Sequence, residues 1–133
     1  MLVTNLFEIY PPENDVIYLK VIDGKDFTAE KMAEAYQILE KIANGKPYKL
    51  MFDVRDVTIS HISSEAFKVS SSKQYAPNQI AEAFLFNSLH VRILINFYFK
   101  VFKPVVPSKM FQCPTEAEKW LKEIQANSYA SAK

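Results

Sequence analysis

The chain has 133 residues, of which 49% are hydrophobic and 23% charged, as is usual for one globular domain that buries its own core. A net charge of +1 excludes a global attraction toward nucleic acid, and only two glycines argue against a glycine-rich phosphate-binding loop. We therefore expect one domain over residues 1–126 and a flexible tail over residues 127–133.

The cellular compartment is indicated by the cysteine count and by the N-terminus. The single cysteine, Cys113, excludes an internal disulfide and is typical of a reducing compartment. The first residues, MLVTNLFEIY, lack the basic region of a signal peptide. No window reaches the ~18 uninterrupted apolar residues of a membrane-spanning helix. We expect a cytoplasmic protein without a transmembrane segment.

The first half of the chain predicts a hairpin, a helix and a buried strand. Residues 2–10 and 16–22 are rich in β-branched and aromatic residues, and the PPEND sequence between them predicts the turn of an antiparallel hairpin. Thr28 can cap a helix whose apolar residues recur at helical spacing until Gly45 ends it. Residues 48–54, YKLMFDV, are nearly all apolar, which predicts a strand buried on both faces.

The second half of the chain alternates helices with strands. The expected elements are a helix over residues 63–75, a strand over 80–87, a helix over 89–103, a strand over 108–112, and a last helix that starts at Thr115 or, equally well, at Cys113 with Pro114 as its first residue. This alternation favours a mainly parallel sheet joined by right-handed crossovers.

Several stretches of the sequence carry a resemblance to a known fold family. They are FKVSSSKQYA at 67–76, AFLFNS at 83–88, Arg92 and Asn96-Phe97 leading to Lys103-Pro104, PSKMF at 107–111, and EAxxWL at 116–121. In these stretches the chain resembles small bacterial proteins of the STAS-like fold, also called SpoIIAA-like, whose function is not established. The core is similar to that of CRAL-TRIO lipid-transfer domains.

The resemblance implies an α/β fold with a four- to five-stranded mixed sheet. Its N-terminal hairpin is antiparallel, the other strands are mainly parallel, and about four helices cover the sheet. In the anti-sigma-factor antagonists of this fold, a serine after a strand that ends in Asp is phosphorylated by a partner kinase. Asp53 matches that strand end, and Ser63 and Ser64 lie near the phosphoacceptor position. The Asp and Gly of the motif are absent here, so a helix cap is the favoured role for these serines.

No group of polar residues predicts catalysis, a metal site or a cofactor. Asp53 and Asp56 flank Arg55 after a buried strand, a pattern more typical of a capped turn and an ion pair than of an acid/base site. The two histidines and the one cysteine lack metal-ligand spacing. The basic residues do not interleave with aromatic ones over a basic face, so we expect no nucleic-acid binding.

The segment SLHVRILINFYFKVFKP, residues 88–104, is the strongest functional signal in the sequence. On a helix, its polar residues Arg92, Asn96 and Lys100 fall on one narrow side, and apolar residues cover almost all the rest. One helix packed on one sheet needs an apolar stripe of little more than ~100°, so the surplus needs a second partner. The residues expected to face a partner or ligand are Val91, Ile93, Leu94, Phe97, Tyr98, Val101 and Phe102.

Four partners are open for this surplus apolar surface: a second copy of the chain, an apolar or lipid-like ligand in a groove beside the helix, a membrane surface, or other parts of the same chain. A two-fold dimer is favoured, with Arg92, Asn96 and Lys100 at its rim. The sequence therefore predicts a non-enzymatic regulatory or protein-interaction module with an unknown protein partner. It would act through this helix and through the loop over residues 53–64. The alternative is a binder of a small apolar ligand.

Overall fold

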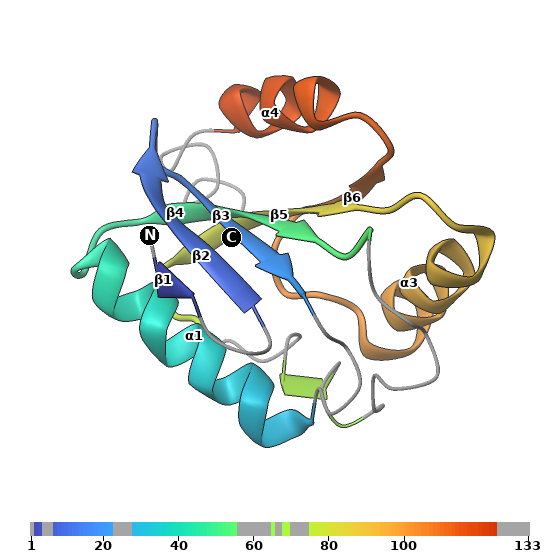
Figure 1. Cartoon of the computed structure of the whole chain (residues 1–133), viewed down its shortest axis with the longest axis horizontal. Helices are drawn as coiled ribbons and strands as arrows, with labels where there is room; N and C mark the ends of the chain where they lie inside the picture. The colour runs from blue at the N-terminus through green and yellow to red at the C-terminus, as the bar shows by residue number, and fades with distance from the viewer. Residues whose placement is uncertain are drawn as a thin grey trace.

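In the described residues, six strands form one sheet in which the spatial order of the strands equals their order in the chain (Figure 1). The computed structural model describes residues 2–3, 7–22, 28–55, 65, 68–69 and 75–124. The strands are β1 (Leu2–Val3), β2 (Phe7–Glu13), β3 (Val16–Val21), β4 (Tyr48–Asp53), β5 (Gln79–Leu85) and β6 (Ser108–Phe111). Strands β1 to β3 pair antiparallel and β3 to β6 pair parallel, which confirms the mixed sheet expected from the sequence.

The N-terminal hairpin differs from its prediction in two ways. Residues 2–10 are not one strand, because β1 pairs antiparallel with Glu8 and Ile9 of β2. The prolines of PPEND do not form the turn, since β2 continues through them to Glu13 with a shift of register. Pairing with β1 ends at Ile9, so the missing proline N–H groups interrupt no ladder on that side. Asn14 and Asp15, with φ of 54° and 67°, make the turn.

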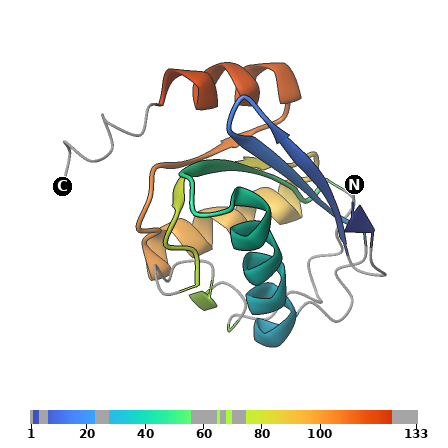
Figure 2. The same cartoon turned by 90° about the vertical axis from the view of Figure 1, so that its left-hand side faces the viewer.

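Helices pack on both faces of the sheet, with α1 and α3 on one face and α4 on the other (Figures 1 and 2). They are α1 (Ala29–Ala43), α3 (Leu89–Phe102) and α4 (Pro114–Glu123). As expected, the hydroxyl of Thr28 caps α1 by accepting a hydrogen bond from the Lys31 N–H at 3.3 Å. The last helix begins at Pro114, so the second of its two predicted starts is the one observed. The helix predicted over residues 63–75 lies mainly outside the described residues.

Each face of the sheet has its own hydrophobic core. The first core lies under α1 and α3, and the second lies between α4 and strands β4 to β6. Ala81 and Ala83 of β5 allow the backbone of α4 to approach closely at Ala117. Because α4 has only 10 residues, no helix of the described chain covers β2 and β3 on this face (Figure 2).

Candidate functional site

Helix α3 presents a row of large apolar side chains to solvent. These residues, which we call the α3 stripe, follow one another at a spacing of four: Leu89, Ile93, Phe97 and Val101. Their exposed fractions are 65%, 56%, 52% and 53% in that order, and Val105 just after the helix is 50% exposed. Single exposed apolar residues are common on proteins, but a row of four on one helix is typical of an interaction surface.

The opposite side of α3 packs on the sheet. Val91 and Tyr98 are buried there, with Tyr98 edge-to-face against Phe84 at 5.9 Å between ring centroids. These two residues therefore belong to the core and not to the predicted interaction surface. Leu94 and Phe102 are half-buried against the same core.

The expected rim of the surface lies beside the stripe. Arg92 and Lys100 are exposed, and Asn96 is half-buried. Around the helix axis, Arg92, Asn96 and Lys100 lie next to the α3 stripe along one of its two edges only. Of the residues predicted to face a partner, Ile93, Phe97 and Val101 are exposed, and the interaction itself stays a prediction.

A shallow groove borders the start of α3. It has a volume of about 620 Å³ and includes the side chains of Arg92, Lys109, Glu116, Phe86, Phe111 and Cys113. Interactions with the backbone N–H groups of Glu116 and Thr115 lower the pKa of the exposed Cys113 thiol. Three charged side chains line this groove, and the alternative from the sequence, an apolar or lipid-like ligand in a groove beside this helix, stays a prediction.

A second cluster of polar groups lies at the carboxyl end of β4. The buried carboxylate of Asp53 accepts hydrogen bonds from the Arg55 side chain, at 2.8 Å from Nη2 and 3.0 Å from Nε, and at 3.0 Å from the Arg55 backbone N–H. The hydroxyl of Tyr18 on β3 also donates to Asp53. The capped turn and ion pair expected from the sequence are confirmed, while Asp56 lies outside the described residues.

The charge state of this cluster follows from its contacts. Burial acts to raise the pKa of Asp53, but hydrogen bonds from Arg55 and Tyr18 outweigh it and hold that pKa below its ordinary value. Burial and the hydrogen bond to Asp53 raise the pKa of Tyr18 to about 12, so its hydroxyl keeps its proton at neutral pH. The cluster is a satisfied ion pair with a neutral hydroxyl donor, and it offers no free base for catalysis.

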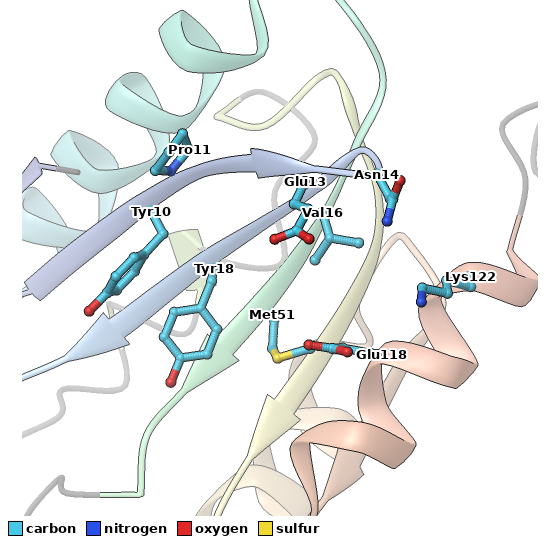
Figure 3. A pocket seen from close by; sticks show the side chains of 9 residues that line it. All are labelled: Tyr10, Pro11, Glu13, Asn14, Val16, Tyr18, Met51, Glu118 and Lys122. Carbon is cyan, nitrogen blue, oxygen red and sulfur yellow. The ribbon is translucent and has the colours of Figure 1, made fainter.

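A pocket opens beside this cluster, between the β2–β3 hairpin and α4 (Figure 3). It has a volume of about 310 Å³. Its lining includes two rings from the hairpin, one thioether from β4 and three charged side chains from the hairpin and α4: Tyr10, Tyr18, Met51, Glu13, Glu118 and Lys122. No sequence motif indicates this pocket, because its lining residues become neighbours only through the sheet and the return of α4.

The remaining expectations from the sequence concern phosphorylation, metal binding and membrane insertion. Ser63 and Ser64 lie outside the described residues, and their phosphorylation stays a prediction. Within the described ranges no group of three His, Cys, Asp or Glu side chains is placed to hold a metal ion. Each helix of those ranges is too short or too polar to cross a membrane.

Comparison with known proteins agrees with this architecture. The sequence profile described as "Domain of unknown function (DUF7793)" matches residues 10–125. The chain belongs to the DUF7793 family. No curated protein matches it significantly.

The fold of this DUF7793 chain is SpoIIAA-like. A solved structure that it resembles is that of an uncharacterized protein of the DUF3478 family, with a SpoIIAA-like fold, from Shewanella loihica PV-4. The two share 15% sequence identity with a TM-score of 0.60, over 91% of this chain and 99% of the other. This similarity confirms the STAS-like fold expected from the sequence, and it concerns the fold alone.

Proposed function

We propose that this protein is a non-enzymatic, STAS-like interaction module of the bacterial cytoplasm that works as a homodimer. Two copies meet through the α3 stripe, and the dimer is the form that a regulatory protein partner recognises. The observation that carries the proposal is the stripe itself. Four large apolar side chains are exposed to solvent on the outer side of α3, while the inner side of the helix packs on the sheet.

The spacing of the stripe favours another helix as its partner. Residues four apart form the ridges that pack into the grooves of a neighbouring helix, at a crossing angle of about −50° when both helices use such ridges. A second α3 supplies a ridge of this kind, and a two-fold axis brings identical patches together. The same patch on both copies makes the contact self-complementary.

The charges of α3 are compatible with this contact. Leu89–Phe102 contains no Asp or Glu, and its cations Arg92 and Lys100 adjoin the stripe on one side. At the rim of a dimer these cations keep their hydration, while Phe97 and Ile93 lie near its centre, where aromatic and aliphatic anchors carry most of the binding energy. The loop over residues 53–64, with Ser63 and Ser64 as candidate phosphoacceptors, is the second predicted contact with a partner.

The test is the mass of the protein in solution at two concentrations, by light scattering and native mass spectrometry. Wild type is expected to have twice the mass of the chain, and Phe97→Glu to have the mass of one chain while keeping its circular dichroism spectrum. Ile22→Glu is the matched control, because Ile22 is an exposed apolar residue outside the stripe and this variant is expected to stay dimeric.

Two outcomes would count against the dimer. A wild-type protein with the mass of one chain at both concentrations would exclude self-association. If that chain carried a small apolar adduct, the alternative function, binding of an apolar or lipid-like ligand beside α3, would replace it.

A further inference from the structure

We propose that the pocket between the β2–β3 hairpin and α4 binds a small organic cation, an amine carried on a flat apolar body. This inference goes beyond the proposed function, since the pocket lies on the face of the sheet opposite α3 (Figures 1 and 3). It rests on the shape of the pocket, the fixed position of its aromatic wall, and the balance of its charges.

The shape suits a molecule with one apolar flat side. The buried side chain of Met51 forms the floor, and the rings of Tyr10 and Tyr18 form a wall, 5.3 Å apart between centroids and inclined at 75°. In Figure 3 Met51 lies between Tyr18 and Glu118. The volume of about 310 Å³ is at the small end of the ~300–1,000 Å³ range of ligand pockets.

The aromatic wall is held in place before any ligand arrives. The hydroxyl of Tyr18 donates to the buried carboxylate of Asp53, and Arg55 fixes that carboxylate by an ion pair at 2.8 Å. The hydroxyl of Tyr10 donates to Glu8 at 2.7 Å. A binding surface that is already ordered loses less side-chain entropy when the ligand binds. In this proposal the cluster at the end of β4 positions the aromatic wall of the pocket.

The charges around the pocket select a cation. Glu13 and Glu118 contribute two carboxylates against the single ammonium group of Lys122. Glu118 and Lys122 have the i, i+4 spacing that often gives a helical ion pair, yet among the described residues neither they nor Glu13 form one. Aromatic rings add to the attraction, because their faces bind cations and not anions.

The experiment is a titration with three probes of the same shape and different charge: phenethylamine, phenethyl alcohol and 3-phenylpropionate. The reporter is the NMR shift of the Met51 methyl group, which lies at the floor of the pocket. Saturable binding of the amine is expected to be tighter than that of the alcohol by about two- to fivefold, the effect of an ion pair with the exposed carboxylates of Glu13 and Glu118. The propionate is expected to bind most weakly.

Charge-changing variants then locate the site. Glu118→Gln and Glu13→Gln should each weaken amine binding by about two- to fivefold, and Lys122→Gln should strengthen it. Glu123→Gln on the same helix is the matched control, because Glu123 is exposed and outside the pocket, and it should change nothing.

Three results would overturn the proposal: no saturable shift of the Met51 methyl group with the amine, equal binding of the alcohol and the amine, or weaker amine binding by Lys122→Gln.

Discussion

Replacing Glu82 with Gln is expected to stabilise the protein by an amount that grows with pH. Glu82 lies on β5 and is fully buried on the side of the sheet that carries the first core, next to Tyr36 of α1. Its carboxyl group accepts a hydrogen bond from the Tyr36 hydroxyl at 3.4 Å. Burial raises its pKa from 4.5 to about 8, against the smaller opposing effect of hydrogen bonds from Tyr36 and Gln79.

The direction in which the unfolding free energy changes with pH follows from proton binding. The pKa of Glu82 is higher in the folded than in the unfolded chain, so the folded protein holds more protons between pH 4.5 and about pH 8. The contribution of protonated Glu82 to the stability of wild type is therefore fully present below this range and is lost as the pH rises through it. The slope is about 1.4 kcal/mol per pH unit, so the free energy of unfolding should fall by roughly 3 kcal/mol up to neutral pH and by roughly 5 kcal/mol in all. Because Gln cannot ionise, the unfolding free energy of Glu82→Gln does not fall in this way.

Urea unfolding followed by circular dichroism, repeated at several pH values between these two pKa values, measures the effect. The quantity of interest is the difference in unfolding free energy between Glu82→Gln and wild type, because the titration of other groups cancels in it. A constant offset only reflects a difference in packing, so the slope with pH is the test. Glu123→Gln, at an exposed carboxylate, should give no slope. A pH-independent difference for Glu82→Gln would refute the reasoning.

Four further substitutions test other parts of the structure. Tyr98→Ala should lower the unfolding free energy by about 3–5 kcal/mol and Phe97→Ala by less than about 1 kcal/mol, because only Tyr98 is buried; urea unfolding that gave the reverse order would show that α3 is turned the other way. Asp53→Asn should cost about 2 kcal/mol at neutral pH, since the Arg55 guanidinium loses its charged acceptor. Because the folded-state pKa of Asp53 is lowered, this cost should shrink as the pH falls through that pKa, and unfolding curves with a constant cost would contradict the ion pair. Asp15→Gly should raise the unfolding free energy by a few tenths to ~1 kcal/mol and with it the melting temperature, because glycine adopts a φ of 67° without steric strain. A lower melting temperature would argue against the left-handed turn.

The order of the elements could be predicted from the sequence because it depends on local signals. The cap at Thr28 and the apolar run of residues 48–54 identify α1 and β4 without knowledge of their neighbours. The hairpin turn lies after the prolines and not at them, because a proline is tolerated in a strand where no partner needs its N–H, and here pairing with β1 has already ended and the register with β3 shifts.

The contacts of the candidate sites likewise divide into local ones, which the sequence predicts, and long-range ones, which it does not. The pairing of Asp53 with Arg55 is a contact between residues two apart, and the sequence predicts it. The bond from Tyr18 to Asp53 spans 35 residues and depends on the parallel register of β3 and β4. The orientation of α3 could not be predicted either, because its apolar residues cover more than one side and only its packing against β5 distinguishes Tyr98 from Phe97.

The two proposed surfaces lie on opposite faces of one sheet, so dimerisation and amine binding should be independent. Coupling between distant sites requires an element with two arrangements that both sites bias, and here a packed sheet with a separate core on each face lies between them. Phe97→Glu should therefore break the dimer without changing the affinity for phenethylamine, and Glu118→Gln should weaken amine binding without changing the mass. An affinity that differed between dimer and monomer would mean that strands β4 and β5, which contribute to both cores, shift when two copies associate.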